Sequence, residues 1–335
     1  MIQTDVIIIG GGPAGAACAW SLKQNNVDCL ILDQYRFPRL KPCAGWITLE
    51  VLQDLDLNIS DYPYGLTTFT SLHISIHGLK FRLPTRQYAI RRYEFDDWLL
   101  HRAGAPVQVH EVKTITKVRN GYIVGGEFFS KYLVGAGGTH CPVYRTFFKT
   151  SSPRAKESLI VAQEEEFPYV YTDKHCRLWF LENNLPGYAW YVPKADGYVN
   201  VGLGAKAEQL KANGATLKNH WNRLVEKLDK LGLVRDHAFK PKGYSYYLRQ
   251  NLPEVRRDNA FVVGDAAGLA TLDMGEGIGP AIKSGLLAAQ AIIHDADYSV
   301  ASIPKYSLRS LIRLGSALPS ARARGTDRPA MRQRG

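Results

Sequence analysis

The chain has 335 residues, 45% of them hydrophobic and 22% charged, which predicts a globular protein with a sizeable core in one large or two closely packed domains. Its formal net charge is +11. No helix-turn-helix motif or aromatic residues that could recognise bases accompany the basic residues, so no nucleic-acid partner is expected. The five irregularly spaced cysteines argue against a disulfide framework and for a cytoplasmic protein. No run approaches the roughly 20 apolar residues of a membrane span. No cysteine or histidine cluster predicts a metal site.

The first element has the pattern of a dinucleotide-binding βαβ unit. Residues 6–15 read VIIIGGGPAG, and the apolar run predicts a buried parallel strand followed by a helix over residues 13–24. Gly10 is expected to make the tight turn, Gly12 to let the backbone approach a pyrophosphate, and Gly15 to let the helix pack close to the strand.

A second strand and an acid complete this unit. Residues 29–32 are apolar, and Asp33 follows them at the position where an acidic side chain accepts hydrogen bonds from a ribose. The helix directs its N-terminal amides at the phosphates. The unit predicts a dinucleotide site and by itself leaves FAD and NAD both open.

Later segments return to the same nucleotide domain. A helix is predicted from Arg92, short strands lead to the glycine turn at Gly137, and residues 260–268 form an apolar strand that runs into Gly264 and Asp265. In many flavoproteins such an aspartate reaches the ribityl chain and such an arginine approaches the flavin or the pyrophosphate. These returns favour FAD over NAD.

The intervening segments predict a second sheet. Hairpin turns are expected at residues 77–78 and 196–197, and an amphipathic helix is expected over residues 216–231. The expected strands cover residues 72–76, 80–83, 158–167, 176–181, 187–192 and 198–204. A closing helix is expected over residues 275–294, and residues 316–335 are arginine-rich and read as a solvated tail.

Several of these segments together resemble the geranylgeranyl reductase family of FAD-dependent oxidoreductases, within the hydroxylase-like flavoproteins. The matching motifs cover roughly residues 1–310: the N-terminal fingerprint, PRLKPCAG at 38–45, RYEFD at 92–96, YAWYVPK at 188–194, NVGLG at 200–204, GDAAG at 264–268 and GEGI at 275–278. The chain departs from the family at Ala44, where glycine is common, at Gly137-Gly138, where Asp-Gly is common, and before GEGI, where proline is common.

The resemblance implies an α/β fold: a Rossmann-like FAD-binding domain with an inserted antiparallel-sheet substrate domain (α+β). The FAD-binding domain is expected to be discontinuous, over residues 1–60, 90–155 and 255–315. The substrate domain is expected over residues 61–89 and 156–254.

The resemblance also singles out candidate catalytic residues. Cys43 is expected near the flavin, where its thiol donates a proton or gates the pocket; the alternative is a small residue packed in a tight loop. Tyr188 and Trp190 share one strand face and are expected to wall an apolar pocket, with a plain sheet core as the alternative. Weaker additions to this wall are Trp46, Tyr244, Tyr246 and Tyr247.

The expected cofactor-binding residues come from seven separate segments of the chain. They are Gly10, Gly12, Pro13, Ala14, Gly15, Asp33, Gln34, Cys43, Ala44, Gly45, Arg92, Gly137, Gly264, Asp265, Gly275, Gly277 and Ile278. The glycines before residue 278 let backbone amides reach the flavin oxygens.

Three functions remain open at this point. The first is an FAD-dependent reductase that saturates C=C bonds of polyprenyl chains in a lipid or pigment precursor, with NAD(P)H or another electron donor. The second is a flavin-dependent monooxygenase or halogenase acting on a small aromatic substrate. The third is a flavin-binding protein without activity. The expected partner is an apolar small molecule or lipid, and the expected location is the cytoplasm, with weak contact to the inner membrane surface through the basic tail.

Overall fold

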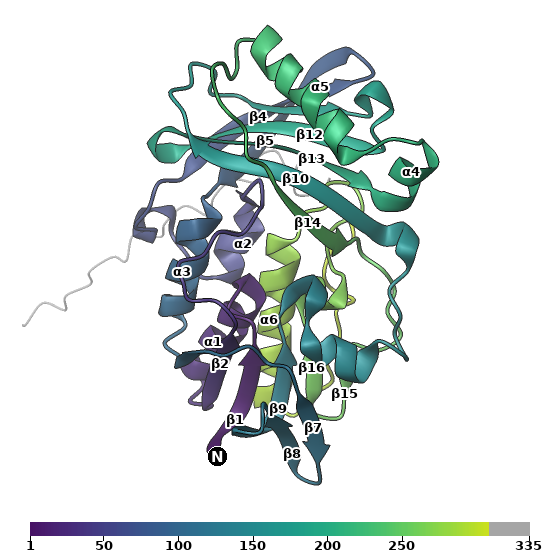
Figure 1. Cartoon of the computed structure of the whole chain (residues 1–335). Helices are drawn as coiled ribbons and strands as arrows, with labels where there is room; N and C mark the ends of the chain where they lie inside the picture. The colour runs from purple at the N-terminus through teal and green to yellow at the C-terminus, as the bar shows by residue number, and fades with distance from the viewer. Residues whose placement is uncertain (308–335) are drawn as a thin grey trace, which may run out of the picture.

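The computed structural model describes residues 1–307 and contains two eight-stranded sheets. Figure 1 shows the first sheet below and the second sheet above, with helices α1, α2, α3 and α6 between or beside them. The basic tail, residues 316–335, lies outside the described residues. The expected fold class is confirmed: a Rossmann-like unit is combined with a second, largely antiparallel sheet.

The first sheet is built around β1, which pairs in parallel with β2 on one side and β9 on the other. The strand order reverses at β1, so a crevice for a ligand forms at the carboxyl ends of these strands. Strands of this sheet are β1 (Ile2–Ile9), β2 (Cys29–Asp33), β6 (Val107–Val109), β7 (Ile115–Val118), β8 (Gly121–Val124), β9 (Phe128–Gly135), β15 (Arg256–Arg257) and β16 (Ala260–Val262).

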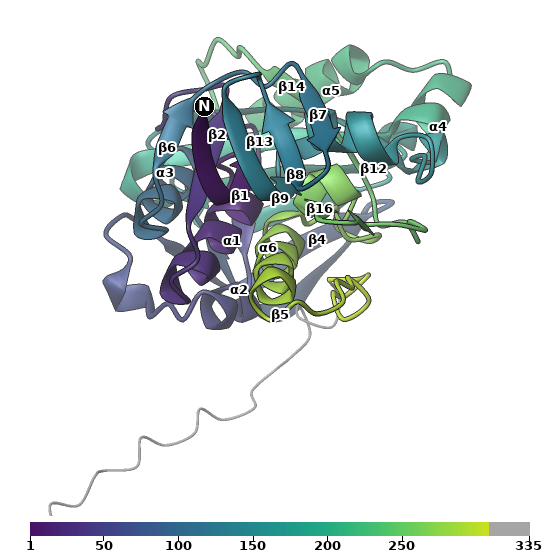
Figure 2. The same ribbon diagram turned by 90° about the horizontal axis from the view of Figure 1, so that it is seen from below.

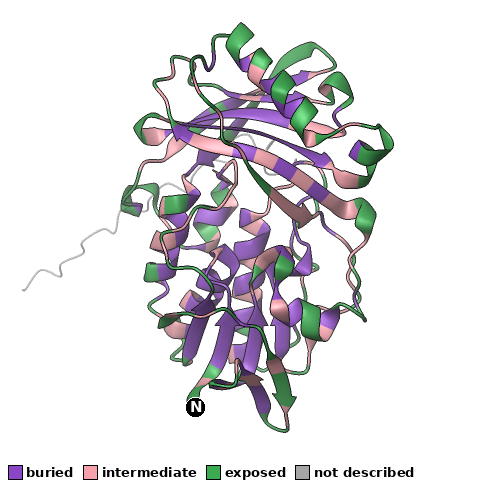
Figure 3. Ribbon diagram, in the orientation of Figure 1, coloured by how far each residue is buried: buried purple, intermediate pink, exposed green. Residues whose placement is uncertain are grey.

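Helices cover one face of the first sheet because their inward faces are apolar and small. The helices are α1 (Pro13–Gln24), α2 (Leu49–Asp54), α3 (Arg92–Arg102) and α6 (Ile278–Ile293). Figure 2 shows α1 and α6 side by side, and both contribute to the largest buried apolar cluster. The carboxyl-terminal half of β1 and all of β2 are buried (Figure 3).

The second sheet has the order β14-β10-β13-β12-β11-β4-β5-β3. It differs from a purely antiparallel sheet in one place, because β11 pairs with β4 in parallel. The chain returns to β11 from a distant segment instead of through a hairpin. The strands are β3 (Trp46–Ile47), β4 (Thr67–Ile76), β5 (Leu79–Ala89), β10 (Leu159–Pro168), β11 (Cys176–Phe180), β12 (Gly187–Lys194), β13 (Tyr198–Lys206) and β14 (Lys242–Tyr247).

The two faces of the second sheet have different covers. Helices α4 (Ala207–Ala212) and α5 (Leu217–Lys230) lie on the outer side, where Trp221, Leu224 and Leu228 of α5 join a buried cluster. Leu231, at the end of the expected helix, is 48% exposed, because it caps the helix beyond the last turn. The inner face turns toward the first sheet.

The turns form as their residues predict. His77-Gly78 and Asp196-Gly197 both have positive φ values, the backbone of tight hairpin turns. Trp46 and Ile47, which fall in the segment expected to bind FAD, pair with β5 of the second sheet. Among residues 1–307, no helix is both long enough and apolar enough to cross a bilayer.

Candidate functional site

A cavity of about 710 Å³ lies between the carboxyl ends of the first sheet and the inner face of the second. Segments distant in the sequence meet there: the N-terminal fingerprint, the 39–46 loop, Arg92, the inner face of β10 and β12, and residues 272–278. Every predicted site residue lines this cavity except Gly15.

Gly15 acts through packing. A Cβ on this residue would lie 1.9 Å from the carbonyl oxygen of Gly10, so only glycine lets α1 approach β1 this closely. This contact fixes the helix start beneath the turn that follows β1, which is the close helix–strand packing the fingerprint predicts.

The start of α1 has the features of an anion site. Gly12 is the N-cap and provides no side-chain cap, and the first turn carries no acidic residue, so the backbone amides there are available to a phosphate. The Asp33 carboxylate at the end of β2 accepts hydrogen bonds from the backbone N–H groups of Gly11 (2.8 Å) and Tyr35 (2.9 Å). These contacts hold the acid at the edge of the cavity.

Asp265 lies in the turn that follows β16, and it also lines the cavity. Its carboxylate accepts a hydrogen bond from the Tyr244 hydroxyl at 3.0 Å. Lys41 lies over the Tyr244 ring, and burial, together with the charges of Arg92 and Arg39, lowers the pKa of Lys41 to about 7 against the opposing effect of Asp265. The cavity therefore holds an amine whose charge depends on what binds beside it.

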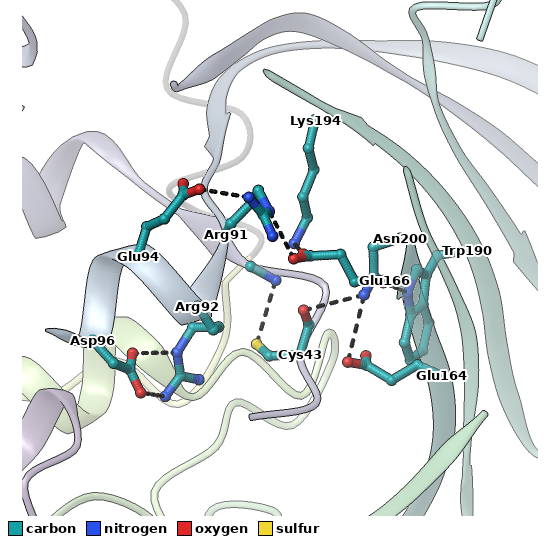
Figure 4. Close-up of polar contacts among 11 residues, drawn as sticks. Cys43, Arg91, Arg92, Glu94, Asp96, Glu164, Glu166, Trp190, Lys194 and Asn200 are labelled. Carbon is teal, nitrogen blue, oxygen red and sulfur yellow. Dashed lines mark hydrogen bonds and ion pairs between the residues drawn. The ribbon is translucent and has the colours of Figure 1, made fainter. Parts of the chain in front are cut away.

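The 43–45 loop crosses the cavity and is held from both sides (Figure 4). The Cys43 sulfur accepts a hydrogen bond from the Gly45 backbone N–H at 3.3 Å and another from the Arg92 side chain. Gly45 has φ +76°, and a Cβ there would lie 2.1 Å from the Ile90 carbonyl oxygen and 2.7 Å from Lys194 Nζ. The glycine that ends the motif is therefore required by geometry.

Arg92 opens α3 and forms a bidentate ion pair with Asp96, with distances of 2.5 and 2.7 Å. Both side chains are buried, and Figure 4 shows the guanidinium beside Cys43. The pKa of Arg92 is raised by the nearby Asp96 despite desolvation. A fixed positive charge therefore stands at the cavity wall, where it suits an anionic or electron-rich ligand.

The inner face of the second sheet forms an aromatic wall. Tyr188 and Trp190 both line the cavity, with ring centroids 5.6 Å apart. The Tyr188 hydroxyl donates to the Met274 carbonyl oxygen at 2.5 Å, and Trp190 Nε1 donates to Asn200 Oδ1 at 2.7 Å. Because each polar tip has a hydrogen-bond partner, the rings can present their apolar faces to the cavity.

The weaker candidates divide between two places. Trp46, Tyr244 and Tyr246 line the cavity, whereas Tyr247 does not. Tyr247 points to the opposite side of β14, where Arg154 lies over its ring. The difference follows from strand alternation, which sends successive side chains of β14 to opposite faces.

Comparisons with known proteins agree with this arrangement. Residues 8–75 match the model of the NAD(P)-binding Rossmann-like domain. An uncharacterised protein of Methanosarcina barkeri is 34% identical over 309 residues, which are 87% of this chain and 75% of that protein. Digeranylgeranylglycerophospholipid reductase 1 of Methanopyrus kandleri is 26% identical, covering 92% of this chain and 86% of that enzyme. Menaquinone reductase of Mycolicibacterium smegmatis is also 26% identical, covering 89% and 79% of the two chains.

This chain belongs to the geranylgeranyl reductase-like family of FAD-dependent oxidoreductases. A geranylgeranyl bacteriochlorophyll reductase-like protein from Thermoplasma acidophilum has the same fold, with a TM-score of 0.78, 22% identity and coverage of 88% of this chain and 79% of that one. The flavin-dependent brominase Bmp2 also shares the fold, with a TM-score of 0.70, 19% identity and coverage of 90% and 81%. The fold is therefore common to reductases and halogenases.

FAD is the cofactor of this family, and the cavity fits it. The uncapped start of α1 would offer amides to the pyrophosphate, Asp33 would accept from a ribose, and the cavity lining continues through Asp265 to the 275–278 loop. As a member of the family, the protein is an enzyme.

Sequence reasoning missed several polar residues at the centre of the site. Glu164 lines the cavity and is only 5% exposed; fully buried Asn200 lies beside it, and fully buried Lys194 pairs with Glu166. A signal was present in the run Glu164-Glu165-Glu166: on a strand with one buried face, three consecutive acids cannot all point to solvent.

A buried ion cluster joins the two halves of the site (Figure 4). Glu166 pairs with Lys194 at 2.6 Å and with Arg91 at 3.0 Å, and Arg91 also pairs with Glu94 of α3 at 2.5 Å. Lys194 is fully buried, so its charge depends on Glu166 for compensation. The cluster ties β10 and β12 to the start of α3, directly behind the 43–45 loop.

Proposed function

We propose that the protein is a reductase that saturates C=C bonds in a polyprenyl chain of a lipid or pigment precursor. The observation that carries this proposal is the aromatic wall of Tyr188 and Trp190 facing the cavity across from the flavin loops. Full-length similarity to a reductase of digeranylgeranyl lipids and to a menaquinone reductase supports the same class of substrate.

The chain's residues divide the work of holding the cofactor. The start of α1 and Asp33 would hold the pyrophosphate and a ribose, Asp265 the ribityl chain, and Arg92 with the 275–278 amides the ring. FAD, when reduced by NAD(P)H or another donor, supplies hydride. The protein contributes orientation and a dry surface, because Tyr188 and Trp190 close the cavity with apolar faces.

An apolar wall selects its substrate through burial. A hydrocarbon chain has no polar group to recognise, so its affinity comes from the apolar area removed from water, at about 25 cal/mol per Å². Longer chains that reach Trp190 bury more area than short ones. The pocket therefore favours extended polyprenyl groups over compact aromatic substrates.

A second surface supports contact with a membrane. At the tip of the β4–β5 hairpin, Leu79 is 76% and Phe81 46% exposed, and they share the inner face of the sheet with Ile76 and Ile74, their register partners. Exposed Lys80 lies between them. Apolar side chains flanked by positive charge favour an anionic bilayer surface, from which a lipid substrate would come.

The activity is tested by incubating the reduced holoenzyme with a geranylgeranyl lipid and with farnesyl and geranyl analogues. We expect products heavier by two hydrogens per saturated bond, measured by mass spectrometry. The variant Trp190→Ala is expected to weaken binding of the longest chain most, with FAD content unchanged. Equal losses for all chain lengths would contradict the proposed wall.

The monooxygenase alternative is tested on the same protein. Stopped-flow oxidation of the reduced enzyme by O₂ would show an absorbing C4a-peroxide species in a monooxygenase. We expect slow reoxidation without it. An oxygenated aromatic product and no saturated alkene would replace the reductase proposal.

A further inference from the structure

Glu164 is a buried carboxyl group that faces the cavity. It lies on β10 in register with Gly202 of β13, and shares the inner face with Ile160 and Ala162, which also line the cavity. Among the described residues of the second sheet that line the cavity, Glu164 is the acid.

The surrounding contacts hold Glu164 beside the 43–45 loop (Figure 4). Asn200 Nδ2 lies 3.5 Å from Glu164 Oε1 and 3.5 Å from the Cys43 carbonyl oxygen, and the Cys43 backbone donates a further hydrogen bond to the carboxyl group. Asn200 is itself oriented by Trp190. The acid is therefore fixed between the loop expected at the flavin and the aromatic wall expected at the substrate.

The other acids of this strand are used differently. Glu165 points to the outer face and pairs with His237 at 3.0 Å, and Glu166 pairs with Arg91 and Lys194. Within residues 1–307, Glu164 has no ion pair. Of the three adjacent glutamates, Glu164 is therefore the one that lines the cavity without forming an ion pair.

We propose that Glu164 donates the proton that completes the saturation of the alkene. This inference rests on the proposed function. The O–H bond of Glu164 breaks as a new C–H bond forms on one alkene carbon, and the other carbon receives hydride from the reduced flavin. The π bond is consumed, the alkene is reduced by two electrons, the flavin is oxidised by two, and the carboxylate regains its proton from water.

The charges around Glu164 suit this role. Burial raises the pKa of Glu164 to about 7, with Glu166 adding to the shift, while Lys194, Asn200 and the Cys43 backbone oppose it. Tyr246 of β14 also faces it. A general acid is most effective when its pKa lies near the working pH, so Glu164 is suited to carry and to release a proton near neutral pH.

Cys43 is the competing donor, and its geometry differs. Its sulfur is engaged by the Gly45 N–H and by Arg92, on the nucleotide side of the loop (Figure 4). Glu164 is on the substrate side. In this arrangement Cys43 stabilises the conformation of the loop, and Glu164 is the residue placed to donate the proton.

The test compares Glu164→Gln with Glu165→Gln, which makes the same change one residue away on the opposite face. For Glu164→Gln we expect kcat to fall about 100-fold or more, with KM and FAD content near wild type. In the wild type kcat falls as pH rises above about 7, because the acid must be protonated; the variant loses this limb. Glu165→Gln keeps both the rate and the limb, and Glu164→Asp restores part of the rate.

A second measurement does not depend on turnover. Carboxyl ¹³C NMR of glutamate-labelled protein without flavin should show a resonance that titrates near pH 7 and is missing in Glu164→Gln. Titration of that group near pH 4 to 5, or a wild-type rate and pH profile in Glu164→Gln, would overturn the assignment. If the wild type saturates no alkene while the resonance titrates near 7, the failure belongs to the proposed function, and the proton-donor role falls with it.

Discussion

The two walls of the cavity are built in different ways. The nucleotide wall consists of turns contiguous in the sequence, such as residues 10–15 and 264–268, and it offers backbone amides and glycines. The sheet wall is assembled from side chains on four strands, Glu164 among them, and Asn200 packs beside Glu164. Backbone recognition suits a cofactor of constant shape, whereas side-chain recognition can be altered residue by residue to suit a substrate.

The largest expected effect comes from crowding the nucleotide wall. Gly15→Ala places a methyl group 1.9 Å from the Gly10 carbonyl oxygen, and displacing α1 should weaken FAD binding by about 3 kcal/mol or more. Gly204→Ala on the sheet wall is the matched control, since its nearest neighbours lie at 3.8 Å. Flavin fluorescence titration measures both, and equal affinities would show that the close approach is not needed.

Breaking the buried ion cluster tests the sheet wall. Glu166→Gln leaves the fully buried Lys194 without its counter-charge and should lower the free energy of unfolding by about 3 kcal/mol. Glu94→Gln, on the α3 side of the same cluster, should cost less than about 1 kcal/mol, because Arg91 keeps Glu166. Urea unfolding measures the two, and a reversed order would contradict the buried character of Lys194.

Protonation of buried acids should make stability depend on pH. Burial raises the pKa of both Glu164 and Glu276 to about 7, so between about pH 4.5 and 7 the folded state binds more protons than the unfolded state. Stability should therefore fall as pH rises through this window, by roughly 2 to 3 kcal/mol for each group.

Unfolding measured at several pH values checks this dependence. Glu164→Gln and Glu276→Gln should each flatten the curve, and the double variant should flatten it further. An unchanged slope in Glu164→Gln would mean that the carboxyl group is ionised throughout the window in the folded protein.

Asp265→Ala should have a smaller effect on the cofactor. It removes an acceptor at the cavity wall that also holds the Tyr244 hydroxyl, which should weaken FAD binding by roughly 1–3 kcal/mol. Isothermal titration with FAD measures the loss. Tyr244→Phe serves as the control that removes the hydroxyl alone. A loss of affinity of equal size in this variant would show that the effect comes from the Tyr244–Asp265 hydrogen bond and not from a contact of Asp265 with FAD.

The smallest effect is expected at the boundary between the walls. Cys43→Ser replaces one small acceptor with another beside the Gly45 N–H, so FAD content should stay at the wild-type level and turnover should fall less than in Glu164→Gln. Absorbance of bound flavin and product analysis measure these. A larger loss of turnover in Cys43→Ser than in Glu164→Gln would indicate that the Cys43 thiol, and not Glu164, donates the proton.

The nucleotide wall was largely predictable because its contacts are local. Residues 6–15, 29–33 and 260–268 each carry a strand and its turn in one continuous segment, and glycine, proline and aspartate have narrow conformational uses. Helix α5 was predictable from the helical spacing of its apolar residues, and the hairpin turns were predictable from residue types that favour tight turns. Leu231 and the parallel pairing of β11 with β4 were not predictable, since they depend on where a helix ends and which distant strand lies beside it.

The sequence by itself determined the dinucleotide unit, the two-sheet class and a set of residues that the fold brings together around one cavity. Only the tertiary structure decided which of three adjacent glutamates enters the cavity and which basic residue is buried against them. The reason is physical: a strand sends alternate side chains to opposite faces, and which face becomes the interior depends on the register of β10 against β13 and β14. Those pairings join segments far apart in the chain, and through them burial sets the protonation of Glu164.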